Sequence, residues 1–378
     1  MQPALPSYKR WTDLNGKKVL VRVDFNAPVH LVDGKLEVSD DFRIRATLPL
    51  LDDLIKQGAQ VTCMTHFGRP KGQPTEEFSV APIRRRLNEL CPGIDLLENL
   101  RFNPGEELND PEFGASLVEG FDYYINEAFG ASHRAHASIM VPPMLLPSAA
   151  GPNLQREVST LLGALENPVR PFIAIVGGAK VKDKLAITRV LVEKADVVIV
   201  GGGMAYTFEY AQGRTIGSSL FDATNVDNCR ELMQTEKVRI PVDSLGLKSD
   251  QSFGSAAFSD PVIVFGENIP EDSMGLDIGP LSSAAFAREI QEAGTILWNG
   301  PMGVFEDPRF AAGTEAIARA VAQSPGYSIV GGGDSVAAMQ QFKLESEVDF
   351  VSTGGGASLE LVEFGDLPGL RALRESKG

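Results

Sequence analysis

The sequence predicts an α/β protein with two domains, each a mainly parallel sheet flanked by helices. The chain has 378 residues, a length typical of two domains. Strand-like and helix-like segments alternate through its first half. In its second half, an apolar strand runs straight into glycines five times. Strands that alternate with helices in this way are typical of βαβ units and a parallel sheet.

The spacing of apolar residues places the elements of the first half. Helices are expected where apolar residues recur at helical spacing, and strands where short β-rich runs occur. The expected strands cover residues 18–26, 59–66, 95–100 and 122–129, and the expected helices cover residues 43–57 and 82–90. Gly58 follows the first of these helices, at a position where glycine often ends a helix.

A proline-rich segment separates the two halves. Residues 141–153 (VPPMLLPSAAGPN) contain four prolines, and we expect no regular element there. We therefore place the domain boundary in this segment, with the first domain at residues 1–153. A helix-like stretch at residues 154–166 follows and is expected to carry the chain into the second domain.

The second half repeats one unit, a strand that ends in glycines. In a parallel sheet the carboxyl ends of the strands line one edge, where ligands commonly bind. Glycine allows close backbone approach there, and the N-terminus of the next helix favours phosphate. One such turn is weak evidence, but five predict a phosphate-binding edge. The five segments are IAIVGGAK (173–180), VVIVGGGM (197–204), ILWNGPMG (296–303), YSIVGGGD (327–334) and DFVSTGGG (349–356).

Two familiar nucleotide motifs are missing from these turns. The sequence has no GxxxxGK[ST] motif, so a P-loop enzyme is excluded. Gly201–Gly203 does not continue to GxGxxG, because Tyr206 occupies the position of the last glycine. This argues against a dinucleotide-dependent dehydrogenase, although the fold class permits one.

Composition limits the classes of partner. The net charge is −15, which argues against nucleic acid or an anionic membrane as a general partner. Residues 1–150 carry 16 Lys and Arg against 20 Asp and Glu, and residues 151–378 carry 19 against 30. No apolar run is long enough to span a membrane, and the first residues do not resemble a secretory signal. Three cysteines without a CxxC motif fit a reducing compartment, so a cytoplasmic location is expected.

Charged residues beside the glycine turns predict a nucleotide-phosphate site in the second half. Lys180 and Lys184 are four residues apart and could share one face of a helix. Asp334 ends the fourth turn, where a carboxylate beside phosphates needs a cation, so it is a candidate Mg²⁺ ligand. Its alternative role is to cap the helix that is expected to begin near Ser335.

Arginines and histidines predict a small-anion site in the first half. Arginine suits bidentate recognition of carboxylate or phosphate, and histidine can donate to either group. The candidate segments are RVDFN (22–26), Arg43, THFGRP (65–70), NLRF (99–102) and SHRAH (132–136). Phosphoryl transfer needs mainly positioning and charge neutralisation, which these groups can supply.

Ten motifs along the chain resemble those of phosphoglycerate kinases, in the family's order. They are RVDFNAPV, THFGRPKG, LLENLRF, NEAFGASHRAHAS, RPFIAIVGGAKVKDKL, VIVGGGMAYTF, LDIGP, ILWNGPMGVFE, IVGGGDSVAA and VSTGGGASLELVE. The resemblance covers nearly the whole chain. It implies two Rossmann-like domains that face each other across a cleft, and reversible phosphoryl transfer between 1,3-bisphosphoglycerate and ADP, giving 3-phosphoglycerate and ATP with Mg²⁺.

The resemblance also implies roles for individual residues. The 3-phosphoglycerate site would comprise Asp24, Asn26, Arg43, His66, Arg69, Arg101 and Arg134. The nucleotide site would comprise Gly178, Lys180, Lys184, Gly202, Asn299, Pro301, Glu306, Gly332, Gly333, Asp334 and Ser335. Glu306 would hold the ribose, Asp334 would meet the metal, and Arg43 and Lys180 would stabilise the phosphoryl group in flight. The second domain would cover residues 154–357, and residues 358–378 would return to the first domain of a monomer.

A few positions depart from the family's usual pattern. Ser335 replaces a common threonine but keeps the hydroxyl, and Thr65 and Phe67 replace serine and leucine beside His66. The segment Ser244–Ser259 departs most, which leaves the base pocket less defined than the phosphate contacts. A non-catalytic binding protein of the same fold is the remaining alternative. Such a protein would be expected to lose Arg43, Lys180 or Asp334, and all three are present.

Overall fold

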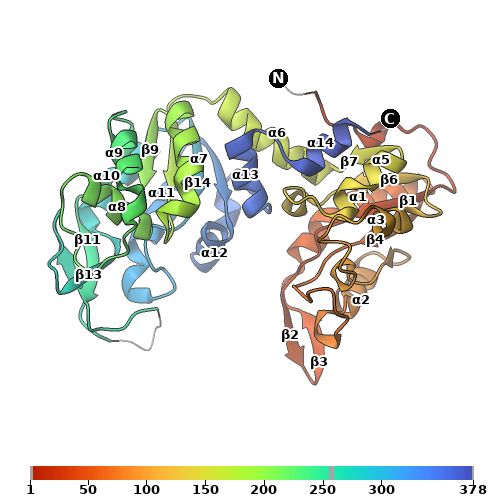
Figure 1. The fold of residues 1–378 in the computed structure, drawn as a ribbon, viewed down its shortest axis with the longest axis horizontal. Helices are drawn as coiled ribbons and strands as arrows, with labels where there is room; N and C mark the ends of the chain where they lie inside the picture. The colour runs from red at the N-terminus through yellow and green to blue at the C-terminus, as the bar shows by residue number, and fades with distance from the viewer. Residues whose placement is uncertain (1–2, 255–258, 377–378) are drawn as a thin grey trace. The chain divides into compact units, whose positions relative to one another are not determined.

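The computed structural model describes residues 3–254 and 259–376 (Figure 1). The chain divides into two compact units, one of Met1–Thr160 with Phe364–Gly378 and one of Leu161–Glu363. Each unit contains a parallel sheet with helices packed on it, so the α/β fold class predicted from the sequence is confirmed. The bounds predicted from the sequence stay predictions: residues 1–153 for a 3-phosphoglycerate-binding domain of the kind the resemblance implies, 154–357 for a nucleotide-binding domain, and 358–378 for a returning segment.

The first unit is built on a five-stranded parallel sheet in the order β5-β4-β1-β6-β7. Its strands are β1 (Lys18–Arg22), β4 (Gln60–Met64), β5 (Asp95–Leu96), β6 (Tyr123–Asn126) and β7 (Ser148–Ala150). Its helices are α1 (Phe42–Lys56), α2 (Ala81–Leu90), α3 (Pro111–Val118), α4 (Ala137–Met140), α5 (Pro142–Leu145) and α14 (Pro368–Arg374). Helices on both faces bury β1 completely after its first residue, which explains its continuous apolar run.

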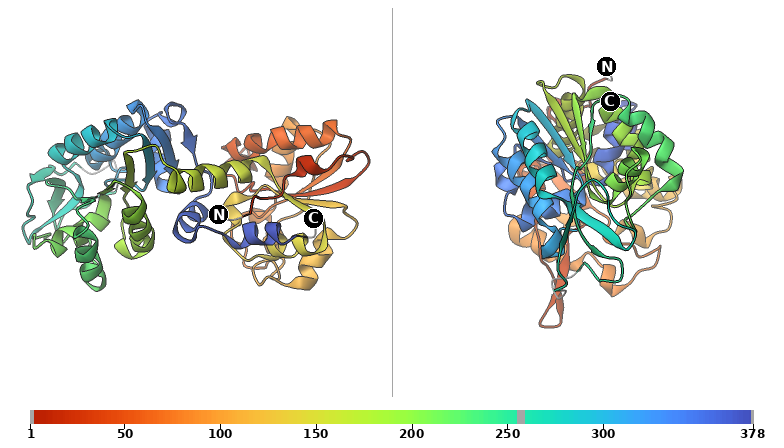
Figure 2. Two further views of the ribbon diagram at one scale, coloured as in Figure 1. Left: turned by 90° about the horizontal axis from the view of Figure 1, so that it is seen from above. Right: turned by 90° about the vertical axis from the view of Figure 1, so that its left-hand side faces the viewer.

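Two expected strands are shorter than the sequence suggests. The segment expected at residues 95–100 pairs only over β5, and the segment at residues 122–129 pairs only over β6. Each segment then continues into a short 3₁₀ helix, Leu100–Phe102 in the first and Phe129–Ala131 in the second. The polar residues that follow β5 and β6 therefore lie beyond the carboxyl ends of these strands. The hairpin of β2 (Val29–Val32) and β3 (Lys35–Val38) was not predicted, and Figure 2 shows it projecting from this unit.

The expectation of no regular element at residues 141–153 was wrong. This segment forms α5, the edge strand β7 and the start of α6 (Pro152–Glu166). Its prolines occupy positions where a missing backbone N–H costs little. Pro142 and Pro143 lie in the first turn of α5, and Pro152 begins α6. Pro147 only has to supply a carbonyl, which accepts a hydrogen bond from the Tyr124 amide at 3.1 Å.

The second unit is built on a six-stranded parallel sheet in the order β10-β9-β8-β14-β15-β16. Its strands are β8 (Phe172–Val176), β9 (Val197–Val200), β10 (Val238–Arg239), β14 (Thr295–Asn299), β15 (Tyr327–Gly331) and β16 (Phe350–Val351). Its helices are α7 (Val181–Lys194), α8 (Ala205–Ala211), α9 (Val226–Met233), α10 (Pro280–Gln291), α11 (Ala312–Gln323), α12 (Gly333–Gln341) and α13 (Gly356–Phe364). All five predicted strand-to-glycine segments lie in this sheet, so their turns share one edge.

A second, antiparallel sheet lies beside the large one in this unit. Its strands are β12 (Ile263–Phe265), β11 (Ser244–Lys248) and β13 (Ser273–Ile278), in that order. The sequence did not predict this sheet. Strand β11 and the turn after it come from the divergent segment Ser244–Ser259. Residues 255–258 of this segment lie outside the described part of the chain.

Helix α6 crosses the division between the two units, and helix α14, near the end of the chain, belongs to the first unit. Helix α6 begins in the first unit and ends in the second, because the division between the units falls after Thr160. Helix α14 packs on α4, α5 and β7 of the first unit, where Figure 1 shows it in blue beside β7. No helix among the described residues is long and apolar enough to cross a membrane.

Candidate active site

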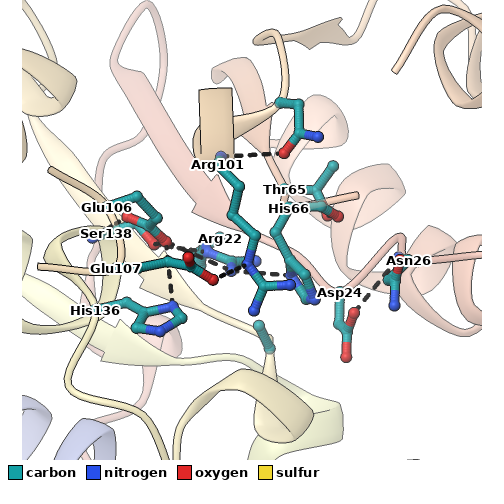
Figure 3. A network of polar contacts seen from close by, with 12 residues as sticks. Arg22, Asp24, Asn26, Thr65, His66, Arg101, Glu106, Glu107, His136 and Ser138 are labelled. Carbon is teal, nitrogen blue, oxygen red and sulfur yellow. Dashed lines mark hydrogen bonds and ion pairs between the residues drawn. The ribbon is translucent and has the colours of Figure 1, made fainter. Parts of the chain in front are cut away.

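A buried arginine organises the polar centre of the first unit (Figure 3). Arg22 ends β1 and is fully buried. Its guanidinium donates to the Ser138 hydroxyl at 2.9 Å and lies 3.2 Å from Nδ1 of His66. Glu106 balances its charge at 4.0 Å and is itself held by the amide and hydroxyl of Ser138. The buried Arg22–Glu106 pair therefore holds the side chain of His66 in one orientation.

His66 is held as a neutral imidazole. Burial lowers its pKa to about 3; Asp24 acts in the opposite direction, and Arg22 adds to the lowering. Arg22 can only donate, so Nδ1 of His66 must accept, and the proton of the ring resides on Nε2. The histidine therefore offers one N–H donor, which suits a carboxylate or phosphate oxygen.

Asp24 and Arg43 form an ion pair at the same edge. Arg43, in the first turn of α1, donates to Asp24 Oδ2 at 2.7 Å. Burial alone would raise the pKa of Asp24, but His66, Arg43 and Arg22 outweigh it and hold that pKa below its usual range. Asn26 accepts a hydrogen bond from the Gly68 amide at 3.0 Å, which joins the turn after β1 to the turn after β4.

The other predicted arginines differ in exposure. Arg101 is buried, donates to the Gly68 carbonyl at 2.7 Å and lies 3.2 Å from Glu107. Burial lowers the pKa of Arg101; Glu107 acts in the opposite direction, and the half-buried Arg134 adds to the lowering. Arg69 is exposed and has no ion-pair partner among the residues that the structure describes. The seven predicted residues thus supply one pre-formed cluster and one exposed cation beside it.

Sequence reasoning included Arg22 only within the candidate segment RVDFN (22–26) and did not name Glu106 or Ser138, which hold it. Arg22, Glu106 and Ser138 come from three distant segments, and only the fold brings them together. One signal was available, because Arg22 ends an apolar strand whose other members are buried. A charged residue at a buried strand position normally has a partner of opposite charge.

In the second unit, the predicted glycine turns interlock. The Gly178 amide donates to the Pro301 carbonyl at 3.0 Å, and the Gly202 amide donates to the Met302 carbonyl at 2.9 Å. Gly202 has φ of 65°, and a Cβ there would lie 2.7 Å from the Gly178 nitrogen. Only glycine allows this approach, so the turns after β8, β9 and β14 form one continuous backbone surface.

Lys184 and Asn299 connect this surface to the turn after β15. Lys184 donates to the Asn299 side-chain oxygen, and the Asn299 nitrogen donates to the Gly331 carbonyl at 3.0 Å. Burial lowers the pKa of Lys184 to about 8, although Asp334 and Asp183 act in the opposite direction. Lys184 is therefore a partly desolvated cation close to Asp334, a setting typical of functional sites.

The remaining charged residues lie at the starts of two helices. Lys180 is exposed at the N-cap of α7, so it precedes the helix and does not share a helical face with Lys184 as expected. Gly332, with φ of 90°, is the N-cap of α12, so the alternative cap role for Asp334 was wrong. Asp334 is exposed in the first turn, and the buried Ser335 hydroxyl accepts from the Gly300 amide at 2.5 Å.

A cavity of about 410 Å³ lies against these turns. Five predicted nucleotide residues line it, namely Gly178, Gly202, Pro301, Glu306 and Asp334. The rest of its wall is mostly apolar and includes Tyr206, Leu220, Phe253, Leu276 and Val304. A flat, largely apolar ring fits such a wall, while charged groups fit the edge with the helix N-termini. Phe253 belongs to the divergent segment, so that segment does contribute to the cavity.

The donors at this edge fit a magnesium ion that arrives with phosphates. No group of three or more His, Cys, Asp or Glu in the described chain could hold a metal alone. Asp334 offers one carboxylate on the cavity wall. Mg²⁺ usually takes one or two carboxylates and completes its shell with phosphate oxygens and water, so this donor set suits it.

Comparison with known proteins agrees over nearly the whole chain. The family model described as "Phosphoglycerate kinase" matches residues 10–95 and 91–364. The phosphoglycerate kinase of Rubrobacter xylanophilus is 47% identical over 96% of this chain and 97% of its own length. The solved phosphoglycerate kinase structure from Coxiella burnetii covers 98% of this chain and 99% of its own, with a TM-score of 0.88 and 36% identity.

These matches agree with the ten motifs, the parallel sheets and the cavity at the glycine turns. The chain therefore belongs to the phosphoglycerate kinase family, the enzymes that transfer a phosphoryl group reversibly between 1,3-bisphosphoglycerate and ADP to give 3-phosphoglycerate and ATP.

Proposed function

We propose that the polar centre of the first unit binds 3-phosphoglycerate and that the cavity of the second unit binds Mg·ATP or Mg·ADP. The observation that carries this assignment is the cavity lined by the glycine turns and Asp334, together with the partly desolvated cation Lys184 close to Asp334. An apolar wall beside helix N-termini matches the two ends of a nucleotide, its base and its phosphates. The arginine cluster of the first unit matches the smaller acid, which carries a carboxylate and a phosphate.

In the first unit, each group has a distinct role toward 3-phosphoglycerate. The neutral His66 donates from Nε2, and the arginines Arg69, Arg101 and Arg134 attract the carboxylate and phosphate. Asp24 and Asn26 accept from the alcohol hydroxyl of the substrate, because each side-chain oxygen retains a lone pair beside its bond to Arg43 or Gly68. The ion pair with Asp24 keeps Arg43 in a fixed position before the substrate arrives.

In the second unit, the nucleotide phosphates meet the amides of the glycine turns, Lys180 and Lys184. Glu306 accepts from the ribose hydroxyls, and Gly332, Gly333 and Ser335 offer backbone groups at the start of α12. Asn299 holds Lys184 in place. Asp334 would hold the Mg²⁺ that comes with the nucleotide, and this ion neutralises the charge of the phosphate oxygens.

The transfer itself is an in-line displacement. An oxygen of the ADP β-phosphate forms a bond to the phosphorus of the acyl phosphate, and the bond from phosphorus to the carboxyl oxygen breaks. Arg43 and Lys180 neutralise the charge spread over the three equatorial oxygens of the group in flight. Hinge closure brings the reacting oxygens together, and the protein acts as a monomer in the cytoplasm.

A coupled assay tests this proposal. Purified protein is given 3-phosphoglycerate and Mg·ATP with an excess of an NADH-linked dehydrogenase that consumes 1,3-bisphosphoglycerate. NADH oxidation that requires both substrates and magnesium is expected. Protein that binds the nucleotide by calorimetry yet gives no NADH oxidation would instead be a non-catalytic binder. Protein that oxidises NADH without the added dehydrogenase would belong to the dehydrogenase class.

A further inference from the structure

The cavity wall contains two apolar side chains that water still reaches. Phe253 is 44% exposed and Leu220 is 57% exposed, and both line the cavity of the second unit. Large apolar side chains at the mouth of a cavity gain free energy when a ligand covers them. Phe253 does not sit on a strand or a helix, so something else must hold it in place.

An ion pair holds the backbone around Phe253. Arg309, in the 3₁₀ helix Pro308–Phe310, donates to the Ser252 carbonyl at 2.9 Å. Asp307 accepts from the Gly254 amide at 3.1 Å and lies 2.8 Å from the Arg309 guanidinium. Both residues that flank Phe253 are thus bound to one pair, which we call the Asp307–Arg309 clamp.

The clamp also holds the returning part of the chain. Arg309 donates to the Asp260 carbonyl at 3.3 Å, and its guanidinium lies 4.0 Å from the Asp260 carboxylate. The backbone before residue 255 and the backbone after residue 258 are therefore bound to the same side chain. The Arg309 guanidinium also stacks over the Phe310 ring at 5.2 Å, which fixes it from the core side.

The clamp is too well buried to be an ordinary surface ion pair. The Asp307 side chain is fully buried and that of Arg309 is 13% exposed, whereas the Arg319–Glu315 pair of the same unit is 52% and 39% exposed. A desolvated pair with several hydrogen bonds has a defined geometry, and removing one partner leaves the other charge unsatisfied. Such a pair can fix a loop, which an exposed pair rarely does.

The clamp lies next to a second residue of the cavity wall. Glu306, which lines the cavity, directly precedes Asp307 in the chain. One rigid turn, Glu306–Phe310, therefore presents Glu306 to the cavity and also holds the loop with Phe253. The positions of these two wall residues are coupled through the clamp.

We propose that Asp307 and Arg309 are positioning residues for nucleotide binding, acting by holding Phe253 against the apolar end of the bound nucleotide. This inference rests on the proposed nucleotide site. The clamp does not touch the reacting groups, so it acts on the affinity for the nucleotide and not on the transfer step. It also leaves the 3-phosphoglycerate site of the other unit unaffected.

The test compares Arg309→Met, Asp307→Asn and Phe253→Ala with the unaltered enzyme. The dissociation constant of Mg·ADP, from calorimetry, is expected to rise by about 5- to 20-fold in each single variant, as for the loss of one apolar contact of this size. The KM for Mg·ATP should rise in parallel, while kcat and the KM for 3-phosphoglycerate change less than about twofold. Arg309→Lys, which keeps the charge, serves if Arg309→Met does not fold.

A double-mutant cycle shows whether the clamp acts through Phe253. If it does, Arg309→Met should add less than about twofold to the effect of Phe253→Ala, because the contact is already lost. The matched control is Arg214→Met, since Arg214 also joins a carbonyl, Pro241, to a carboxylate, Glu267, and neither of these lines the cavity. This control should lower the melting temperature without changing the Mg·ADP affinity.

The possible outcomes separate the inference from the proposed function. If the unaltered enzyme does not bind Mg·ADP, the proposed nucleotide site itself is wrong. If it binds but a folded Arg309 variant keeps its affinity, or the two effects multiply fully, the clamp has no positioning role. If Arg309→Met and Arg214→Met lower stability alike and neither alters affinity, the clamp only stabilises the fold.

Discussion

Lys184 is a partly buried cation, and nucleotide binding should depend on it. It donates to Asn299 and lies near Asp334, at the edge where the glycine turns meet. We predict that Lys184→Ala weakens Mg·ADP binding by about 10- to 150-fold, the value of one charge-assisted contact of 1.5–3 kcal/mol. Binding of 3-phosphoglycerate should be unchanged, since its proposed site lies in the other unit. Calorimetry with each ligand measures both effects, and an unchanged Mg·ADP affinity would exclude Lys184 from the site.

The pKa of Lys184 also predicts a pH dependence of nucleotide affinity. Burial lowers this pKa to about 8, so the free enzyme loses the charge of Lys184 as the pH rises through 8. Only the charged form attracts phosphates, and the affinity for Mg·ADP should therefore fall above about pH 8, approaching about tenfold per pH unit. Lys184→Arg keeps its charge at these pH values, so its affinity should stay level. Parallel pH profiles of the two proteins would contradict this prediction.

Arg43 and Lys180 should affect catalysis more than binding. In the proposed function both neutralise charge that develops only as the phosphoryl group moves, and such interactions lower kcat when they are removed. We predict that Arg43→Ala and Lys180→Ala each reduce kcat by about 10²-fold or more, with a smaller change in KM. Steady-state kinetics with each substrate varied measure both constants. A variant with normal kcat and a raised KM would show that its residue binds the ground state and the transition state equally, and so has no specific role in the transfer step.

At the residue scale, the sequence predicted the candidate ligand-binding side chains better than the residues that hold them in place. His66 and Lys184 could be named because their residue types and neighbouring glycines indicate anion binding. The neutral state of His66 could not be predicted, because it depends first on burial and then on Arg22 at 3.2 Å, and Arg22 is itself balanced by Glu106. The partners of a buried charge come from distant segments, and no local pattern reports them.

At the element scale, helix α6 connects the two units and has a buried carboxylate at its start. Glu127 follows β6 and accepts hydrogen bonds from the Asn153 amide at 3.1 Å and the Leu154 amide at 3.4 Å. The Asn153 side chain donates to the Ala46 carbonyl of α1 at 2.7 Å, so the first turn of α6 is held from two sides. The start of this helix is therefore firmly attached to the first unit.

We predict that Glu127 makes the protein less stable as the pH rises from about 5 to 8. Burial raises the pKa of Glu127 to about 8, against 4.5 for the unperturbed group, so the folded state keeps a proton that the unfolded state releases. Stability should fall across this window, by at most about 1.4 kcal/mol per pH unit from this group. Glu127→Gln keeps an acceptor oxygen and removes the titration, so its unfolding free energy should depend less on pH.

Urea unfolding of the two proteins at pH 5, 6.5 and 8 measures this difference. Asp277→Asn is an informative companion, because burial raises the pKa of Asp277 to about 8 in the second unit. It should flatten the pH dependence in the same direction through a different element. Equal slopes for the unaltered protein and Glu127→Gln would show that Glu127 does not titrate in this window.

Elements were predicted well where their pattern is local and poorly where pairing decides. The expected helix at residues 43–57 matches α1, and the five strand-to-glycine segments match five strands of one sheet. The antiparallel strands β11, β12 and β13 were missed because β11 lies in the divergent segment, and each strand pairs with a partner from another part of the chain. The prolines at residues 142–152 misled because each occupies a position that tolerates proline, which only the fold reveals.

At the scale of the whole molecule, the proposed sites belong to different units. The polar centre lies in the unit that contains residues 3–160, and the cavity lies in the unit Leu161–Glu363. Two segments join these units, helix α6 and the chain at the end of α13. Since Glu127 and Asn153 hold the start of α6, any bending should occur further along this helix and near Gly354–Gly356, where α13 begins.

We predict that ligands on both units close the enzyme. Phosphoryl transfer requires the reacting oxygens within a few ångströms and aligned, and water must be excluded from the acyl phosphate. Anionic ligands on one unit attract cationic groups on the other, so each ligand alone should close the molecule partly and both together should close it most. Small-angle X-ray scattering measures this as a decreasing radius of gyration across four states. These are the free protein, the complex with 3-phosphoglycerate, the complex with Mg·ADP, and the unreactive complex with both. Lys184→Ala should abolish the decrease caused by Mg·ADP and keep the one caused by 3-phosphoglycerate. An equal radius in all four states would contradict hinge closure, because mutual attraction across the units must shorten the molecule.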